Sequence, residues 1–322
     1  MEYRRLGRSG LKVSTIGLGS WLTFGRRVSE EGVRACVAAA VDAGILLFDT
    51  ADIYDLGEAE KVVGRALASY PRNEYVLATK LFWPMSENPN DRGLSRKHVM
   101  EACDASLKRL GVDYIDLYQC HRYDPETPVD EVVLAMDDLA RRGKILYWGV
   151  SVWSGEQIRH ALAESDRYLA HRPVSNQPPY SLLNRGIEAE VLPVSRAEGL
   201  GQLVFSPLAQ GLLTGKYAQG RIPEGSRAAD ENRNRFLKPL MTDENLEKAR
   251  RLAELARGMD VTPAQLALAW CLRDPIVSGA IIGATEPGQV RENAKAAELK
   301  VPGDVLAQLD EIFPGSDPPD QP

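Results

Sequence analysis

The sequence predicts a (β/α)8 TIM barrel in the α/β class. Short apolar runs alternate with amphipathic segments almost to the end of the chain. Apolar runs of this length are typical of strands buried on both faces, as in parallel sheets. Eight strand–helix units predict a closed barrel, which needs about 250 residues, and the chain has 322. A single domain over residues 1–322 is therefore expected.

The elements follow in order along the chain. Polar Gly-Arg-Ser-Gly between two short runs predicts a β-hairpin over residues 3–14. Strands are then expected at 16–19, 45–49, 75–80, 114–119, 145–151, 174–177, 202–206 and 279–283. Helical patterns lie near 29–43, 58–69, 95–110, 128–142, 154–164, 185–198, 245–272 and 287–298.

Two further segments account for the remaining length. Residues 217–239 are rich in Gly, Arg, Asn and Pro, which predicts a long loop after the seventh strand. Long loops in compact domains often cover sites as lids. Residues 314–322 are rich in Pro and Asp, which predicts a disordered tail.

Composition excludes several classes of function. The net charge is -6 and no block of Lys and Arg occurs, so no nucleic-acid partner is expected. No run of 18 uncharged apolar residues is present, so no membrane span is expected. Four scattered cysteines lack CxxC spacing, which indicates reduced thiols and no metal site. With no signal-peptide pattern at the start, these features predict a cytoplasmic protein. The oligomeric state is left open, a homo-oligomer included.

A doubly wound nucleotide-binding fold is the main alternative to the barrel. Residues 17–22, Gly-Leu-Gly-Ser-Trp-Leu, begin like a dinucleotide fingerprint. The sixth position is Leu instead of Gly or Ala, and no helix is predicted there. The stretch is better explained as a tight turn from a strand into a loop.

Four polar residues follow the predicted strands at the edge where barrels carry their sites. Asp49 ends one strand, Lys80 ends the next, and His121 follows a third. Tyr54 lies five residues beyond Asp49, in the same loop. Taken alone, the Asp could be a turn cap, the Lys a surface residue, and the His or Tyr structural. Their order at successive strand ends favours a shared site.

The four groups suit protonation of a carbonyl. A buried Lys80 needs a partner, which Asp49 can provide. A nearby ammonium is expected to lower the pKa of Tyr54 and make it a better acid, and His121 can orient the oxygen. No side chain supplies hydride, so a nicotinamide cofactor is implied. Because barrels host many chemistries, an aldolase or isomerase with a Schiff base on Lys80 remains an alternative.

The motifs resemble those of the aldo-keto reductase superfamily. FDTADIYDLGEAEKVVGRAL is similar to its signature, with Asp49, Tyr54, Glu60 and Gly64 at the matching spacings. The likeness continues through ATK, DLYQCHRYD, WGVS, SNQPPYSLLNR, FSPLAQGLLTGKY and IIGATEPGQVREN, so it covers about residues 3–313. GLGSWLTFG and SPLAQGLLTGKY resemble the branch that contains the potassium-channel β subunits and related bacterial reductases.

This resemblance implies roles for individual residues. Asp49, Tyr54, Lys80 and His121 match the catalytic tetrad, and NADPH or NADP+ would be the cofactor, with NADH as a second option. The implied cofactor-binding residues are Ser20, Trp21 and Asp49 near the first strands, Ser151 and Gln177 at the carboxamide, Phe205 on the nicotinamide ring, Ser206, Leu208 and Lys216 along the pyrophosphate, Arg227 as a clasp, and Gly283, Thr285, Gln289, Glu292 and Asn293 around the adenosine phosphate. Thr285 is also expected to cap a helix starting near Pro287.

The chain departs from the family pattern in places. Gly283 and Gln289 stand where many members carry Lys and Arg near the 2′-phosphate, which weakens the electrostatic case for NADPH. The channel β subunits have Asn at the position of His121 and Arg at that of Val152. The retained His121 favours a working enzyme over the alternative, an NADP(H)-binding, redox-sensing regulatory subunit with little turnover.

The substrate is expected to be a small carbonyl compound, an aldehyde or ketone. Arg122 could attract a phosphate or carboxylate, or equally form a structural salt bridge. The residues expected to line the substrate end are Trp21, Trp83, Tyr54, His121 and Trp153, with Phe82 and Tyr180 beside them.

Overall fold

Eight parallel strands close into a barrel, which confirms the predicted fold class. The computed structural model describes residues 1–25, 28–217, 227–229 and 234–315. Neighbouring strands follow chain order, and the last pairs with the first to close the barrel. The strands are β3 (Ile16–Gly19), β4 (Leu47–Asp49), β5 (Val76–Leu81), β6 (Ile115–Cys120), β7 (Ile145–Val150), β8 (Ser175–Asn176), β9 (Gly201–Phe205) and β10 (Val277–Gly283).

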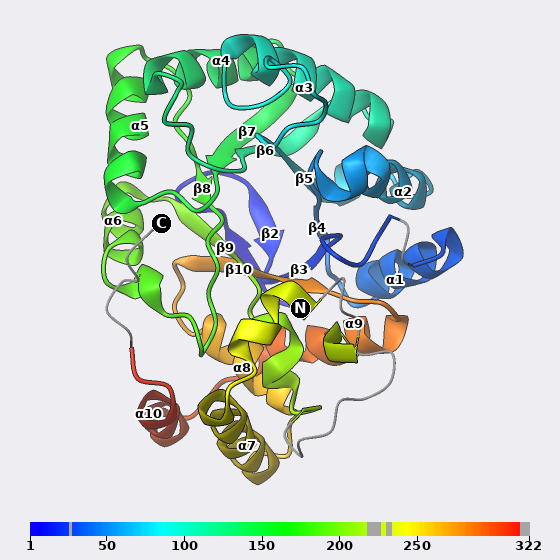
Figure 1. The fold of residues 1–322 in the computed structure, drawn as a ribbon, viewed down its shortest axis with the longest axis vertical. Coiled ribbons are helices and arrows are strands. Elements are labelled where there is room, and N and C mark those ends of the chain that lie inside the picture. The colour runs from blue at the N-terminus through cyan, green and yellow to red at the C-terminus, as the bar shows by residue number, and fades with distance from the viewer. Residues whose placement is uncertain (26–27, 218–226, 230–233, 316–322) are drawn as a thin grey trace.

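Helices surround the barrel and connect successive strands (Figure 1). Their N-termini are marked by capping residues such as Ser29, Ser95 and Ser154, each of which accepts a backbone hydrogen bond at a helix start. The helices are α1 (Glu30–Asp42), α2 (Glu58–Leu67), α3 (Arg96–Leu110), α4 (Val129–Arg141), α5 (Gly155–Arg167), α6 (Val191–Glu198), α7 (Asp243–Gly258), α8 (Pro263–Cys271), α9 (Pro287–Ala294) and α10 (Gly303–Ile312).

The predicted hairpin forms and closes one end of the barrel. Strands β1 (Tyr3–Arg5) and β2 (Lys12–Ser14) pair antiparallel. The Arg8 N–H donates to Gly199 O just before β9 begins, so the hairpin lies at the amino ends of the strands. Its apolar side chains pack with inward-facing strand residues in one buried cluster of Leu6, Val13, Leu47, Ala78, Leu117, Leu203 and Ile281. The opposite end, where the strands finish, carries the long loops.

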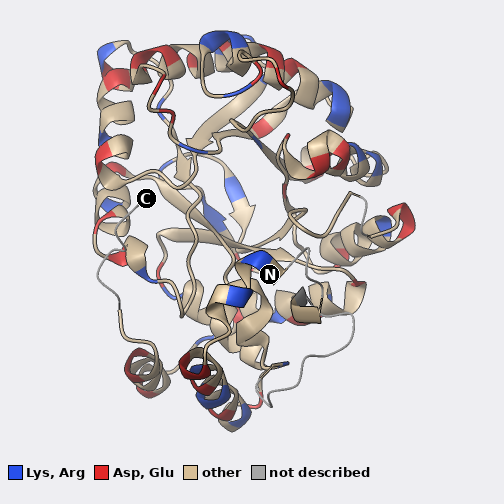
Figure 2. Ribbon diagram, in the orientation of Figure 1, with Lys and Arg blue, Asp and Glu red and all other residues tan. Residues whose placement is uncertain are grey.

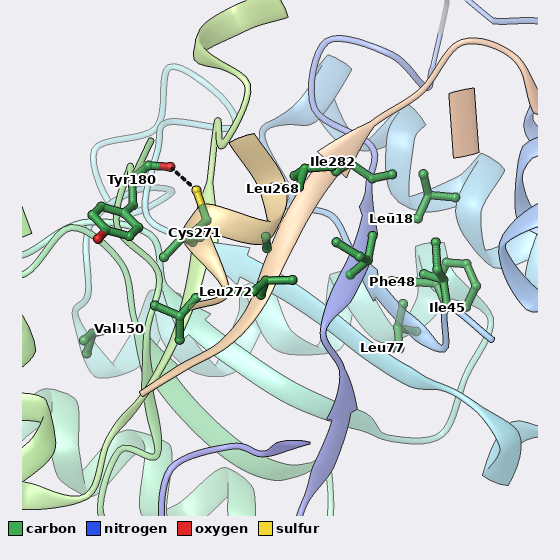
Figure 3. Packing of buried hydrophobic residues seen from close by; sticks show 14 of the residues in the cluster. Leu18, Ile45, Phe48, Leu77, Val150, Tyr180, Leu268, Cys271, Leu272 and Ile282 are labelled. Carbon is green, nitrogen blue, oxygen red and sulfur yellow. Dashed lines mark hydrogen bonds between the residues drawn. The ribbon is translucent and has the colours of Figure 1, made fainter. Parts of the chain in front are cut away.

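The main core lies between the strands and the helices. Figure 3 shows Leu18 of β3, Phe48 of β4, Ile282 of β10 and Leu268 of α8, which all belong to this core. All four are at most 2% exposed. Burial of such side chains is worth about 1.5–3 kcal/mol each, so this layer supplies much of the driving force for folding.

Gly64 lets α2 approach α3 closely. A Cβ at this position would lie 2.2 Å from Leu110 O, which is backbone and cannot turn aside. We expect Gly64→Ala to lower the free energy of unfolding by about 1–3 kcal/mol, as overpacking does. Urea unfolding measures the change. Gly258→Ala in α7 is the matched control, because nothing lies within 4 Å of its Cβ; equal stability of the two variants would contradict the prediction.

Some predicted helix boundaries were wrong. The pattern at 245–272 is two helices, α7 and α8, separated by a turn in which Asp260 has a φ of 55°. Thr262 and Gln265 form a capping box that starts α8. The pattern at 185–198 yields a helix only from Val191, after a 3-10 turn, η3 (Gly186–Glu188). Helix α10 was not predicted, and residues 316–322 of the predicted tail lie outside the described residues.

Acidic and basic residues are interspersed along the outer helices (Figure 2). Several form pairs one helical turn apart, such as Lys97 with Glu101 and Lys248 with Glu244. Every helix in the described part of the chain is too short or too polar to cross a membrane. The four cysteines are buried free thiols.

Candidate active site

Lys80 is the centre of a buried polar cluster at the carboxyl ends of the strands. Its side chain is 0% exposed, and its Nζ donates to Asp49 Oδ1 at 2.5 Å and to Thr50 O at 2.8 Å. The Tyr54 hydroxyl lies 3.5 Å from the same Nζ. The predicted pairing of Lys80 with Asp49 is therefore confirmed, and these partners satisfy the three N–H groups of the ammonium.

Neighbouring charges explain the protonation of Lys80. Burial alone would lower the pKa of Lys80, but the Asp49 carboxylate and the Tyr54 hydroxyl together raise it above its usual value. The amine is therefore held as a cation. A Schiff-base nucleophile must instead be neutral, so this environment disfavours that chemistry.

Tyr54 begins a 3-10 turn, η1 (Tyr54–Gly57), in the loop that follows β4. The expected net lowering of its pKa is wrong for this arrangement. Burial raises the pKa of Tyr54, and the lowering by the Lys80 ammonium is partly offset by the Asp49 carboxylate. The phenol therefore stays protonated through neutral pH. It can still donate, because a developing alkoxide is a far stronger base than phenolate.

His121 lies beside the tyrosine. Its ring centroid is 5.7 Å from that of Tyr54, with the two planes at 78°. Burial, together with the positive charges of Lys80 and Arg122, holds the pKa of His121 well below its usual value. The imidazole is therefore neutral at pH 7 and carries one N–H that can donate to an oxygen. Its buried Nδ1 bonds to none of the described residues.

Two amides complete the cluster from β6 and the end of β8. Gln177 Nε2 donates to Asp49 Oδ2 at 2.9 Å, and the Ser151 hydroxyl donates to Gln177 O at 2.8 Å. Gln119 is fully buried in β6, with Nε2 at 3.5 Å from the same Asp49 oxygen. Sequence reasoning missed Gln119, although an amide inside an apolar strand is a signal that could have found it.

A second buried carboxyl lies behind the cluster. Asp52 is 0% exposed, its N–H donates to Lys80 O, and its Oδ2 has no hydrogen-bond partner among the described residues. Burial raises the pKa of Asp52 well above its usual value, and the nearby Glu60 carboxylate adds to the effect, while Arg109 and Lys80 oppose it. The folded state therefore binds a proton here more tightly than the unfolded chain.

Removing this carboxyl should change how stability depends on pH. The raised folded pKa means that wild-type stability falls as pH rises from about 4, the unfolded value, through the folded pKa. Asn cannot ionise, so Asp52→Asn should gain stability relative to wild type over that range, by about 1 kcal/mol or more at pH 8. Urea unfolding at pH 5 and pH 8 measures the difference. Glu311→Gln, an exposed site, is the control; a pH-independent difference for Asp52→Asn would contradict the assignment.

The residues near the first and seventh barrel strands also lie together. The Ser20 N–H donates to Asp49 O, and its hydroxyl donates to Thr50 Oγ1 at 2.8 Å. The Trp21 ring lies edge-on to Phe205 at 6.2 Å between centroids and contacts Phe236 at 5.2 Å. Phe236 belongs to the predicted long loop, in η6 (Asn234–Phe236). This loop therefore reaches the mouth of the barrel, a contact that the sequence did not reveal.

The segment after β9 turns sharply. Ser206 has a φ of 54°, and its hydroxyl accepts from Gln210 Nε2 at 2.7 Å. Leu208 precedes a 3-10 turn, η4 (Ala209–Thr214), and Lys216 is exposed just beyond it. Arg227 is the first residue of η5 (Arg227–Ala229), and residues 218–226 lie outside the described residues.

The adenosine-side candidates gather at the start of α9. The predicted cap was wrong: Glu286 is the residue before the helix, and no side chain caps it. Thr285 instead donates its N–H to Gln289 Oε1 at 3.0 Å. A surface hollow of about 1050 Å³ is lined by residues of α7, α8 and α9 that include Glu292. A second hollow, of about 570 Å³, is lined by other residues, among them Tyr180 and Arg273. Gly283 ends β10 and is exposed, and Asn293 is buried.

The substrate-side aromatic residues divide into two groups. Trp83 is 38% exposed and lies 6.3 Å from the His121 ring, so it borders the cluster. Trp153 is 2% exposed and packs edge-on against Tyr123, so its ring presents almost no surface to a substrate.

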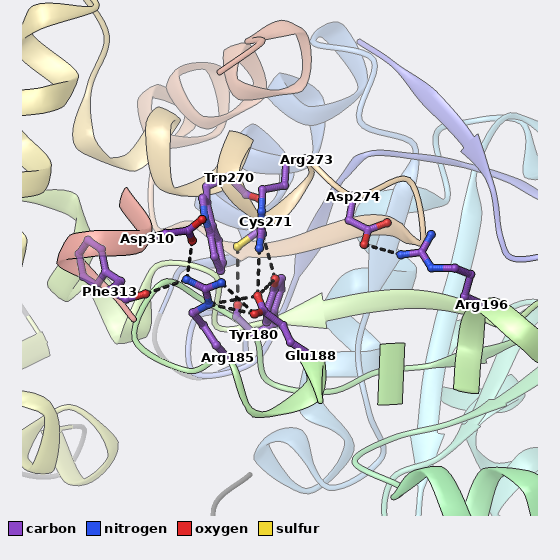
Figure 4. Close-up of polar contacts among 10 residues, drawn as sticks. All are labelled: Tyr180, Arg185, Glu188, Arg196, Trp270, Cys271, Arg273, Asp274, Asp310 and Phe313. Atoms are coloured by element: carbon purple, nitrogen blue, oxygen red, sulfur yellow. Dashed lines mark hydrogen bonds and ion pairs between the residues drawn. The ribbon is translucent and has the colours of Figure 1, made fainter. Parts of the chain in front are cut away.

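Tyr180 does not lie at the substrate end, contrary to expectation. Its hydroxyl donates to Glu188 Oε1 at 2.5 Å and accepts from Arg273, and its ring packs on Trp270 (Figure 4). Arg185, on the same network, bonds Asp310 and Phe313 O. The network therefore holds α10 against the barrel wall and belongs to the fold instead of the site.

Comparisons with known proteins agree with the geometry. A family model described as "Aldo/keto reductase family" matches residues 15–313. A "Probable voltage-gated potassium channel subunit beta" from Oryza sativa subsp. japonica is 44% identical over 302 residues, covering 93% of this chain and 92% of that protein. The protein of the same description from Arabidopsis thaliana is 43% identical with the same coverage. A "Putative voltage-gated potassium channel subunit beta" from Schizosaccharomyces pombe is 44% identical, covering 97% of this chain and 93% of its own length. The chain belongs to the aldo/keto reductase family.

Proposed function

We propose that this protein is a reductase that converts aldehydes or ketones to alcohols with NADPH as the hydride donor. The observation that supports this most directly is the contact of one buried ammonium, Lys80 Nζ, with both the Asp49 carboxylate and the Tyr54 hydroxyl. A phenol held beside a buried cation, next to a neutral imidazole, suits protonation of an oxygen that gains negative charge.

Each residue has a distinct part in this proposal. His121 donates its N–H to the substrate oxygen and orients the carbonyl. Tyr54 transfers its proton to that oxygen, and Lys80 stabilises the phenolate that results. Asp49 holds the ammonium in place and charged. Water is limited around these groups because Asp49, Lys80 and His121 are each less than 10% exposed.

The described residues fit a nicotinamide dinucleotide. When bound, this cofactor supplies the hydride that no side chain can provide. Ser151 and Gln177 would hold the carboxamide, and the half-buried Phe205 ring would stack on the nicotinamide. The start of α9 has no side-chain cap, so its backbone N–H groups could receive a phosphate. Ser20, Trp21, Ser206, Leu208, Lys216, Arg227, Gly283, Thr285, Gln289, Glu292 and Asn293 complete the proposed binding surface.

We infer that NADPH is preferred over NADH by a small factor. Gly283 provides no charge, and Gln289 is engaged with Thr285 and Glu286. Arg291 is exposed on α9 and is the cation nearest in sequence to these positions. One exposed arginine gives a modest advantage to an added phosphate.

A regulatory role is the second candidate, because the similar relatives are described as potassium-channel β subunits. It predicts cofactor binding with negligible turnover. The neutral, buried His121 at the site favours the reductase instead.

Absorbance at 340 nm, followed with NADPH and then NADH, distinguishes the two candidates. Methylglyoxal, glyceraldehyde and 4-nitrobenzaldehyde serve as substrates. Oxidation of the cofactor that disappears in Tyr54→Phe supports the reductase. Cofactor binding without oxidation of either nucleotide, on every aldehyde tested, would favour the regulatory subunit.

A further inference from the structure

Arg122 lies on the substrate side of the proposed active site. It follows His121 directly, and its Nη1 donates to His121 O at 2.6 Å. Its guanidinium carbon lies 5.5 Å from the centroid of the Trp83 ring, which itself faces His121. Arg122, Trp83, His121 and Tyr54 therefore form one continuous group of side chains at the end of β6 and in the neighbouring loops.

Among the described residues, the guanidinium of Arg122 has no carboxylate partner. Half-buried arginines elsewhere have one, as Arg72 pairs with Asp116 and Arg109 with Glu60. Within residues 1–25, 28–217, 227–229 and 234–315, no carboxylate oxygen lies within 4.0 Å of the Arg122 nitrogens. The single hydrogen bond from Nη1 leaves the Nε and Nη2 N–H groups without a partner in the described residues.

An arginine in this position retains its charge at a cost. Burial lowers the pKa of Arg122, and the Tyr54 hydroxyl opposes the effect. A guanidinium nevertheless remains protonated at neutral pH. Partly desolvated charges in proteins are normally paired, and the structural salt bridge that the sequence left open does not form with any carboxylate in the described part of the chain. A bound anion would supply the partner that the described residues lack.

The cofactor phosphates are poorly placed to be that partner. Their proposed sites are at the end of β9 and between β10 and α9. In the eight-stranded barrel, β6 is four strands from β10 in either direction, so Arg122 lies on the opposite side of the mouth. An anion at Arg122 would instead belong to the molecule whose carbonyl lies between Tyr54 and His121.

We infer that Arg122 binds a carboxylate or phosphate of the substrate, so that this enzyme selects carbonyl compounds that carry an anionic group. The inference rests on the proposed function. The guanidinium fork matches both anions through two parallel N–H···O bonds, and the guanidinium carbon lies over the Trp83 ring.

Matched aldehydes test the inference. We would measure kcat/KM with NADPH for 4-formylbenzoate, 4-formylphenyl phosphate and the neutral methyl 4-formylbenzoate, in wild type and in Arg122→Met. The variant should lose about 10- to 100-fold on at least one of the two anionic substrates, as expected for a lost hydrogen-bonded charge, and less than about threefold on the neutral ester. Arg122→Lys should lose less. Arg92→Met, which removes an exposed charge from the loop between β5 and α3, should leave all three values nearly unchanged.

The two anionic substrates show which group is bound. A loss of kcat/KM confined to the phosphate substrate identifies a phosphate site, and a loss confined to the carboxylate substrate identifies a carboxylate site. Equal losses on charged and neutral aldehydes, or no loss on either anion, would overturn the inference.

A binding measurement tests the inference without turnover. If wild type reduces none of the three aldehydes, the proposed function fails, but anion binding can still be followed. Benzoate and phenyl phosphate should then quench tryptophan fluorescence saturably in the cofactor-loaded wild type and not in Arg122→Met. The same quenching in both proteins, or its absence from wild type, would overturn the inference.

Discussion

Tyr54→Phe is expected to lower kcat for carbonyl reduction by about 100- to 10,000-fold, the usual contribution of a positioned general acid. The change removes one hydroxyl and keeps the ring that packs against His121. The Lys80 ammonium retains its two shorter hydrogen bonds to Asp49 and Thr50. Cofactor affinity, measured by quenching of protein fluorescence, should therefore change by less than about twofold.

The pH dependence of the wild-type kcat tests the role of Tyr54 independently. Reduction requires the protonated phenol, and burial raises the pKa of Tyr54 above its usual value. The wild-type kcat should therefore stay level through neutral pH and fall only as the pH rises through the folded pKa, above about 10. Any decline that starts near pH 7 would contradict the assignment.

Tyr118→Phe is the matched control for Tyr54→Phe. It deletes a buried hydroxyl that has no partner among the described residues, so activity should be unchanged. A Tyr54→Phe enzyme that works as fast as the Tyr118→Phe enzyme would end the case for Tyr54 as the acid.

Lys80→Met should have the second large effect, and it should affect both stability and activity. The substitution leaves the buried Asp49 carboxylate without its ammonium. Breaking such a pair from one side costs about 3–5 kcal/mol of unfolding free energy. Activity should also be lost, because the phenolate of Tyr54 would no longer have a neighbouring cation.

A double variant separates the two effects. In Asp49→Asn with Lys80→Met neither buried charge remains, and a neutral pair is often as stable as the ion pair it replaces. Urea midpoints should therefore show the double variant to be more stable than Lys80→Met, while both remain inactive. If the two single losses simply add in the double variant, the ion pair is not the source of the instability.

The strands were the most predictable part of this molecule. A strand in a closed parallel barrel is covered on both faces, so its residues form an uninterrupted apolar run that can be recognised without knowing its neighbours. The polar residues that end those runs, Asp49 and Lys80, were recognisable for the same reason. Their meeting follows from adjacent strands, since β4 pairs with β5.

Helix ends were harder to predict because apolar periodicity can continue across a turn. Residues 245–272 keep a helical pattern although the backbone reverses its handedness at Asp260. The stronger signal was local, namely Thr262-Pro263 followed by Gln265, which fits a capping box with proline in the first turn.

The direction of loop side chains was the least predictable feature. Trp83 and Trp153 both follow strands, but one borders His121 and the other packs against Tyr123. That choice depends on partners distant in sequence, which no local pattern contains. The net pKa of Tyr54 was mispredicted for a similar reason, because the degree of burial depends on the whole assembled mouth.

The hairpin at the amino ends of the strands restricts the routes by which small molecules can reach the site. Leu6 and Val13 fill that end together with the inward-facing strand residues, so a small molecule cannot pass through the barrel from one end to the other. Any molecule that reaches Tyr54 must therefore enter and leave at the carboxyl ends of the strands.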